Sequence, residues 1–323
     1  MAPDPQTALA SFHKAVGDGL RLKILHVLCI GSFSALELSE ILDVRQNSLS
    51  HHLKTLSNAG TINVRRDGNS LYYHLSRHTN DSSTEEGFKV LINALKQWPL
   101  TEDTRQAIER IHAQRSALSE SFFEKNAKHF NEFQEQVAEH DHYSSISQSL
   151  LAPAQSVNVL VEFGPGHGDF LPWLSTSAHE VYAIDKSEAM LAECAQTIKE
   201  HKITNVELLL GDSTTALKDL SDAKRPDVVV ANMVLHHIAE PANFILDVAK
   251  LMKPHGVFVI TDLRQHNQDW ARSACGDVWL GFDMADIEGW VELAGLTIEE
   301  SIFHGQRNGF EVMGLRLRKP LEI

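Results

Sequence analysis

Residues 157–168 read VNVLVEFGPGHG, a run of β-branched and apolar residues that leads directly into a glycine-rich loop. The run predicts a buried strand, and the glycines predict a tight turn into a helix. Similar β-branched runs follow, with helical stretches between them, at 181–185, 206–210, 227–231 and 257–262. This alternation predicts a parallel, doubly wound α/β sheet over residues 151–323.

The end of the chain predicts two more strands. Residues 296–303 and 310–317 are strand-like and are joined by a polar stretch that contains two glycines. A short connection of this kind predicts a hairpin, so one strand of the pair must run against the others. The expected C-terminal fold is therefore a seven-stranded, doubly wound sheet with a reversed final strand.

The spacing of the glycine loop separates two kinds of nucleotide site. A dinucleotide site of the G-x-G-x-x-G type needs a glycine at position 169, where this chain has Asp169. Without a pyrophosphate to hold, the loop and Glu162 can receive an amino-acid moiety, because a carboxylate forms a charge-assisted hydrogen bond with an ammonium group. The loop therefore favours S-adenosylmethionine over NAD.

Acidic residues at the ends of the next two predicted strands fit the rest of such a ligand. Asp185 can accept hydrogen bonds from both ribose hydroxyls, and Asp212 can accept a hydrogen bond from the adenine amino group. Any single acid here is also explained as a strand-end cap, but the acids in this order favour a nucleoside ligand. The expected binding residues are Glu162, Gly164, Gly166, Gly168, Asp185, Lys186, Met190, Asp212, Ser213 and Asn232.

Together with PDVVVAN at 226–232 and LMKPHG at 251–256, these residues resemble class I S-adenosylmethionine-dependent methyltransferases over residues 155–318. The resemblance implies a bound S-adenosylmethionine or S-adenosylhomocysteine. His236 and His237 follow the fourth predicted strand and are weak candidates for a general base, although the pair is also a common framing element of the family. Because the sulfonium already activates the methyl group, the catalytic residue stays unassigned.

The N-terminal part predicts a winged helix. Residues 34–37, Ser-Ala-Leu-Glu, have the pattern of a capping box that opens a short helix, and a second, polar-faced helix begins at about residue 47. Two strand-like runs, 61–66 and 70–75, are joined by Asp-Gly-Asn at 67–69, which favours a hairpin turn. Helix, turn, helix and hairpin in this order are typical of DNA-binding domains.

The run SLSHHLKTLSNAG at 48–60, with Arg-Arg-Asp-Gly at 65–68 and two tyrosines at 72–73, resembles ArsR-type repressors over about residues 8–98. The resemblance implies a homodimer on a double-stranded DNA operator, with a recognition helix from each subunit in the major groove and the wings on the backbone. A winged helix used only for protein contacts is the alternative, and His52 could pack inward. The expected DNA contacts are Ser48, Ser50, His51, Lys54, Arg65 and Arg66.

Composition argues against a metal site and against a membrane. Many ArsR-type proteins sense metals through cysteines in the helix before the turn, but residues 36–41 contain none. The three cysteines show no C-x-x-C spacing, and His129, His140 and His142 are more often surface residues than ligands. No apolar stretch has the length of a membrane helix, and we expect a cytoplasmic protein without a metal.

Charge is divided unevenly along the chain. Residues 1–100 contain ten Lys and Arg against nine Asp and Glu, whereas the remainder contains 19 against 34. A DNA-binding face is therefore compatible with a net charge of −14, because the acidity belongs to the C-terminal part. We expect a DNA-binding and dimerisation domain at 1–98, a helical linker at 99–150 and a methyltransferase-like domain at 151–323.

The fusion of these two parts is similar to ArsR-type proteins implicated in regulating the methionine cycle in response to S-adenosylhomocysteine. It predicts a transcriptional regulator whose operator affinity is modulated by S-adenosylhomocysteine or S-adenosylmethionine. The alternative is an active methyltransferase that acts on a small molecule and uses its DNA-binding domain for autoregulation. A metal-responsive repressor is a third possibility.

Overall fold

The computed structural model describes residues 4–321 except 77–78, 80, 152–156 and 221–223. The chain divides into two compact units, 1–114 and 115–323. The division falls inside one helix, α6 (Glu102–Asn126), and within the stretch expected as a linker. None of the described helices is both long enough and apolar enough to cross a membrane.

The first unit is a winged helix, as predicted. Its three-stranded antiparallel sheet has the order β1-β3-β2, and its helices pack around a common apolar core. The elements are α1 (Pro5–Val16), α2 (Gly19–Leu28), β1 (Phe33–Ser34), α3 (Ala35–Ile41), α4 (Gln46–Asn58), β2 (Ile62–Asp67), β3 (Ser70–Leu75) and α5 (Ser82–Gln97).

Local sequence explains the start of α3 and the inward face of α4. The Ser34 amide donates to Glu37 Oε2 at 2.7 Å, and the Glu37 amide donates back to Ser34 Oγ, which is the predicted capping box. In α4, Leu49, Leu53 and Leu56 recur at helical spacing and are buried in the core. The opposite face of α4 is therefore exposed for contacts outside the unit.

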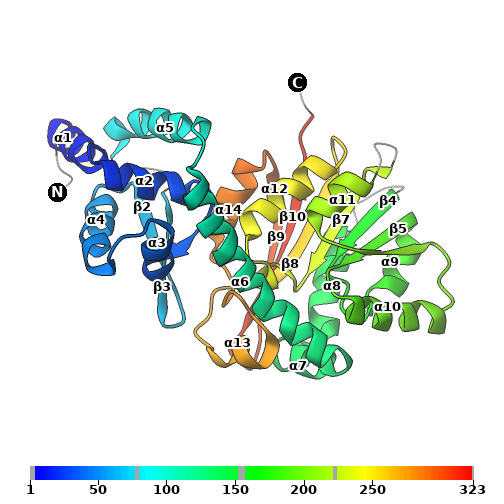
Figure 1. Ribbon diagram of the computed structural model, residues 1–323. Helices are drawn as coiled ribbons and strands as arrows, with labels where there is room; N and C mark the ends of the chain where they lie inside the picture. Colours follow the sequence, from blue (N-terminus) through cyan, green and yellow to red (C-terminus); the bar gives the residue numbers. More distant parts are fainter. Residues whose placement is uncertain (1–3, 77–78, 80, 152–156, 221–223, 322–323) are drawn as a thin grey trace. The chain divides into compact units, whose positions relative to one another are not determined.

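The second unit contains the predicted seven-stranded sheet, in the order β6-β5-β4-β7-β8-β10-β9 (Figure 1). The first five strands along the chain are parallel, and β10 lies antiparallel between β8 and β9. The short β9–β10 connection requires this reversal, whereas helical crossovers make the others parallel. The strands are β4 (Val157–Phe163), β5 (Ala178–Asp185), β6 (Val206–Leu210), β7 (Val228–Asn232), β8 (Val257–Leu263), β9 (Thr297–Gly305) and β10 (Glu311–Arg318).

Helices cover the sheet, and helices also form the linker at residues 99–150, which is called the connector below. The helical linker expected at 99–150 contains three α-helices, α6, α7 and α8, because the chain breaks near residues 127–129 and 138–139, where no proline or glycine signals a break. Two of the three connector helices, α7 and α8, lie wholly within the second unit. The remaining helices are α7 (Phe130–Val137), α8 (His140–Leu151), α9 (Leu171–Ser177), α10 (Glu188–Glu200), α11 (Ser213–Asp219), α12 (Pro241–Leu251), α13 (Trp270–Cys275) and α14 (Met284–Leu293).

Helix α8 packs directly on the sheet, against β7, β8 and β10. The approach is closest at Gly314, where an added Cβ would lie 2.2 Å from Cγ2 of Ile146. Glycine at this position lets the connector lie flat on the sheet, because any side chain would collide with the helix. The connector is therefore a structural part of the second unit as well as a link to the first.

Candidate functional site

A cavity of about 580 Å³ lies at the carboxyl ends of the parallel strands in the second unit. This is the edge of an open α/β sheet where ligands generally bind. Of the ten residues expected from the sequence, nine line the cavity, and Gly168 does not. The nine are Glu162, Gly164, Gly166, Asp185, Lys186, Met190, Asp212, Ser213 and Asn232.

The glycine loop needs its glycines for two different reasons. Gly164, Gly166 and Gly168 all have positive φ, at 63°, 61° and 80°. At Gly164 an added Cβ would also lie 2.4 Å from Cγ2 of Val234, so both conformation and space exclude a side chain. At Gly168 the nearest atom would be Cδ1 of Leu171, at 2.9 Å, because this glycine turns the chain into α9.

Helix α10 holds the glycine loop in place through two side chains. The Cys194 thiol donates to the Gly166 carbonyl at 3.0 Å, and the Thr197 hydroxyl donates to the His167 carbonyl at 2.6 Å. Cys194 is fully buried, which raises the pKa of its thiol. This cysteine therefore has a structural role in the loop and is not a reactive thiol.

Glu162 is the buried carboxyl at the base of the cavity. It is 2% exposed, and its Oε2 has no hydrogen-bond partner among the residues that the structure describes. Burial, with a smaller contribution from the charge of Asp169, raises its pKa to about 8. A ligand ammonium would satisfy the oxygen and return the carboxyl to its charged form.

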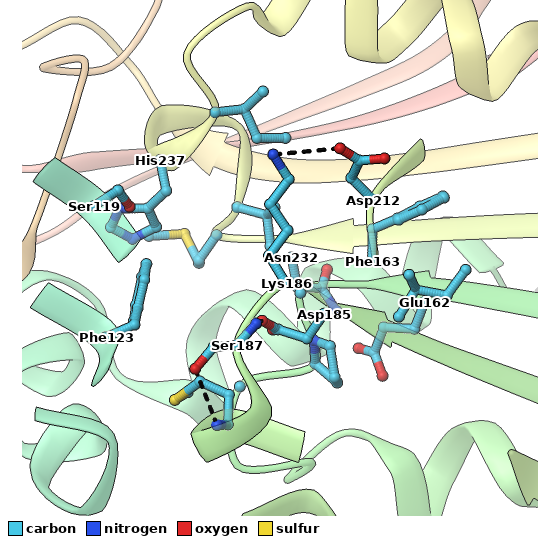
Figure 2. A pocket seen from close by; sticks show the side chains of 18 of the residues that line it. Ser119, Phe123, Glu162, Phe163, Asp185, Lys186, Ser187, Asp212, Asn232 and His237 are labelled. Carbon is cyan, nitrogen blue, oxygen red and sulfur yellow. Dashed lines mark hydrogen bonds and ion pairs between the residues drawn. The ribbon is translucent and has the colours of Figure 1, made fainter. Parts of the chain in front are cut away.

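Asp185 ends β5 and faces the cavity (Figure 2). The Ser187 amide donates to its Oδ1 at 2.8 Å, which sets the orientation of the carboxylate. Burial raises the pKa of Asp185 to about 6, against the opposite effect of the Ser187 and Lys186 amides. The group is mostly ionised at neutral pH and can accept hydrogen bonds from two hydroxyls.

Asp212 has two structural roles besides lining the cavity. Its Oδ1 accepts hydrogen bonds from the Thr214 and Thr215 amides, both at 3.0 Å, and so caps α11. Its Oδ2 lies 3.3 Å from Nζ of Lys186. Burial alone would raise the pKa of Asp212, but hydrogen bonds from the Thr214 hydroxyl and the Thr215 amide, together with Lys186, lower it to about 2. The carboxylate is therefore charged and held at the cavity wall.

Asn232 offers the cavity a hydrogen-bond donor, which the ionised carboxylates cannot do. Its Oδ1 accepts from the hydroxyls of Ser147 and Thr261, at 2.5 and 2.8 Å. These two donors orient the amide, so Nδ2 is left as the group that lacks a partner among the described residues. An oxygen of a ligand can accept from it.

The connector provides a cavity wall that the sequence did not predict. Helix α6 contributes Ser119 and Phe123, α7 contributes Phe130 and Gln134, and α8 contributes Tyr143. The density of aromatic residues in the connector was the available signal. Aromatic residues at helical spacing indicate burial but not the surface that they cover, so the wall could not be assigned from the sequence.

The two candidate histidines lie in different environments. His236 is 2% exposed and does not line the cavity; its Nδ1 lies 2.9 Å from Oδ1 of Asp262, and its Nε2 lies 3.8 Å from Oδ1 of Asp277. Burial lowers its pKa, but the attraction of the two carboxylates outweighs burial and raises the pKa to about 9. His237 does line the cavity, so it is the candidate that can reach a ligand.

One cluster of potential metal ligands occurs within the described part of the chain. Atoms of His236, His237 and Asp277 lie within 4.8 Å of one another. A protonated His236 offsets one of the two negative charges of Asp262 and Asp277, and with a hydrogen on both ring nitrogens it has no lone pair to give a metal.

The three connector histidines differ in exposure. His129 and His142 have exposed side chains, as expected of surface residues. His140 is partly buried and lines the cavity, although it was expected at the surface with the other two histidines. Its environment depends on how α8 packs, which its sequence neighbours do not determine.

The polar face of α4 and the wing, which is the β2–β3 hairpin, carry five of the six expected DNA-contact residues at exposed positions. Ser48, Ser50, His51 and Lys54 are exposed on α4, and Arg66 is exposed on β2. His52 is half-buried, with Nδ1 3.5 Å from Oδ1 of Asp18, so it faces inward.

Arg65 differs from the expectation that it faces DNA. Its guanidinium lies 3.8 Å from the Asp67 carboxylate, and both side chains are buried. Alternate residues of a strand share a face, so Arg65 and Asp67 lie together while Arg66 points to the other side. Of the two wing arginines, Arg66 is therefore the one that is exposed to an approaching phosphate.

Two family models match this chain. Residues 130–301 match the model described as a methyltransferase domain, and residues 18–64 match bacterial regulatory proteins of the arsR family. The arsenical resistance operon repressor of Staphylococcus aureus is 37% identical over 68 residues, which are 21% of this chain and 65% of the repressor.

A second relative is ribosomal RNA small subunit methyltransferase A of Streptococcus equi subsp. zooepidemicus, 31% identical over 128 residues. The match covers 38% of this chain and 43% of that enzyme, so the chain spans less than two thirds of either relative. Magnesium protoporphyrin IX methyltransferase from Synechocystis PCC 6803, solved with S-adenosylmethionine, has a TM-score of 0.50 and 17% identity over 64% of this chain and 97% of that one. This likeness shows the fold.

Proposed function

This chain belongs to the methyltransferase-domain family and carries an arsR-family DNA-binding domain, and from this we propose that it is a transcriptional regulator whose operator affinity is modulated by S-adenosylhomocysteine or S-adenosylmethionine. The proposal needs a ligand site, a DNA-binding face and a physical connection between them. Each of the three has support in the described residues.

The observation that carries the proposal is the sharing of α6. Ala107, Ile108 and Ile111 of this helix are buried in the core of the first unit. Ser119 and Phe123 of the same helix line the cavity of the second unit. A ligand that moves the cavity wall therefore moves a helix that is also part of the DNA-binding core. Linkage between two sites needs such a shared structural element.

The ligand class follows from the carboxylates. Glu162, Asp185 and Asp212 match an ammonium, two ribose hydroxyls and an adenine amino group, and both S-adenosylmethionine and S-adenosylhomocysteine carry all of these. The fold neighbour solved with S-adenosylmethionine supports the same class. The two ligands differ by one methyl group and one positive charge at sulfur, so both belong in the test.

We also propose a homodimer formed through the first unit. Helices α1 and α5 pack together and leave Leu9 41% and Val90 61% exposed. Exposed apolar side chains on adjacent helices favour a protein contact, and a dimer would present two copies of α4 to successive turns of DNA.

The test is operator binding measured with and without ligand. Genomic fragments retained by the full chain supply the DNA, and fluorescence anisotropy gives its affinity at saturating S-adenosylhomocysteine, S-adenosylmethionine or neither. We expect one ligand to change DNA affinity, and DNA to change the affinity of that ligand by the same factor. Asp185→Asn should bind DNA normally and need a roughly 10- to 100-fold higher ligand concentration for the same effect. Identical DNA affinity in all three states would overturn the proposal.

A further inference from the structure

Two side chains of α6, one helical turn apart, make aromatic contacts with different parts of the chain. The imidazole of His112 stacks on the ring of Phe33, with the centroids 5.5 Å apart and the planes inclined by 14°. The guanidinium of Arg115 lies 4.8 Å from the centroid of the Trp279 ring. The first contact lies within the first unit and the second within the second unit. Residues three positions apart are neighbours on a helix surface, so one turn of α6 carries a contact of each unit.

Phe33 joins the wing to the helix-turn-helix within the first unit. It is fully buried in β1, and β1 pairs with β3 of the wing, where Phe33 lies opposite Tyr73. The next residue, Ser34, caps α3, the helix that precedes α4. A shift of the Phe33 ring therefore moves the base of the wing and the start of the helix-turn-helix together.

Arg115 and Trp279 hold a segment of the cavity wall in the second unit. Ile238 and Ala239 line the cavity. The indole N–H of Trp279 donates to the Ile238 carbonyl at 2.9 Å. Nη1 of Arg115 donates to the Ala239 carbonyl at 3.5 Å. Arg115 is 8% and Trp279 2% exposed, so both hydrogen bonds are shielded from water. A ligand that shifts this wall segment therefore also shifts the Arg115 guanidinium.

The backbone between the two contacts is rigid. Helix α6 runs from Glu102 to Asn126 without a glycine or a proline, the residues at which helices usually kink. The two residues between the contacts, Ala113 and Gln114, both favour a helix. A displacement at Arg115 is therefore passed along the helix and not absorbed by a bend.

We propose that the turn of α6 at residues 112–115 couples the nucleoside site to the DNA-binding face, and that His112 and Arg115 are positioning residues that touch neither ligand nor DNA. The inference rests on the proposed function and deepens it, because it names the side chains that carry the linkage. The nucleoside changes the position of the wall segment at 238–239, Arg115 moves α6 with it, and His112 transfers the movement to Phe33.

The first experiment measures the coupling factor, which is the ratio of operator affinities with and without saturating ligand. It uses the full chain and fluorescence anisotropy, with S-adenosylhomocysteine and, separately, S-adenosylmethionine. We expect a factor of at least about fivefold for one ligand in the unsubstituted protein, and of less than about 1.5-fold in His112→Ala and in Arg115→Met. The affinity for that ligand should stay within about twofold in both variants, because neither side chain lines the cavity.

Conservative and control variants separate this role from a general loss of structure. His112→Phe keeps an aromatic ring against Phe33 and should keep the coupling factor. Arg110→Met and Gln114→Ala change exposed positions of the same helix and should behave like the unsubstituted protein. A coupling factor that persists in either His112→Ala or Arg115→Met would overturn the inference and leave the proposed function in place.

Hydrogen exchange measured by mass spectrometry gives a readout that needs no DNA. Saturating the full chain with the same nucleosides should change the exchange of backbone amides at residues 33–42, which include β1 and α3, and Arg115→Met should abolish the change. Unchanged exchange there in the saturated, unsubstituted protein would overturn the inference even where DNA affinity responds to the ligand. A change in exchange without a change in DNA affinity would support the coupling turn and count against the proposed function.

Discussion

Nζ of Lys186 lies 3.3 Å from Oδ2 of Asp212, across the ends of β5 and β6. The other oxygen of Asp212 caps α11. One carboxylate thus contributes to the helix start, to an ion pair and to the cavity wall, and substitution can separate these roles.

Asp212→Asn should keep the cap, because asparagine caps helices as well as aspartate does, whereas Asp212→Ala should lose it. We expect the alanine variant to be about 1 kcal/mol less stable than the asparagine variant. This difference corresponds to an unfolding midpoint about 2–4 °C lower, which thermal unfolding measures. Equal midpoints would show that the cap contributes little.

Asp185→Asn should weaken S-adenosylhomocysteine binding by roughly 10- to 100-fold, because hydrogen bonds to a charged group contribute about 1.5–3 kcal/mol. Isothermal titration calorimetry gives the affinity. Asp219→Asn, an exposed carboxylate at the end of α11, is the control and should bind normally. An unchanged affinity in Asp185→Asn would remove this residue from the ligand site.

Glu162 should release a proton when the nucleoside binds. Its pKa is about 8 in the free protein, so the carboxyl is mostly protonated at neutral pH, and a ligand ammonium would lower the pKa. Affinity should therefore rise as the pH increases toward 8 and level off above about 8. Calorimetry in buffers of different ionisation enthalpy measures the released proton, and Glu162→Gln should abolish the release.

The His236–Asp262 pair should make stability depend on pH. The pKa of His236 is about 9 in the folded chain, above the unfolded value of about 6.5, so its contribution is complete below about pH 6.5 and is lost as the pH rises through 9. The contribution is on the order of 3 kcal/mol. Thermal unfolding measured across this pH range should show the fall, and His236→Gln should flatten it while His201→Gln should not.

Lys54→Ala and Arg66→Ala should weaken DNA binding mainly through lost phosphate contacts. Each substitution should reduce the slope of log affinity against log salt concentration by about 1, on any duplex sequence. Lys23→Ala, an exposed lysine of α2, should leave the slope unchanged. Slopes that match the unsubstituted protein would place the DNA on another face.

The sequence predicted most of the architecture because the relevant signals are local. β-Branched runs, the capping box at 34–37 and the Asp-Gly turn each depend on residues a few positions apart, and the structure confirms the elements that they indicated. The glycine spacing with Glu162, Asp185 and Asp212 also leads to one site in space, because the carboxyl ends of parallel strands meet at one edge of a sheet.

Other parts of the site depended on contacts that spacing does not encode. The sequence could not separate His236 from His237, since adjacent residues share every local feature, nor show that Arg65 pairs with Asp67. It did not indicate that Phe123 would wall the cavity.

By itself, then, the sequence determined the two domains, a parallel sheet with one reversed strand and the class of ligand to be expected. Only the tertiary structure decided which titratable groups are buried, which of the paired histidines faces the cavity and that α6 belongs to both units. The physical reason is that backbone conformation follows from neighbours along the chain, whereas burial and charge state follow from side chains brought together from distant segments.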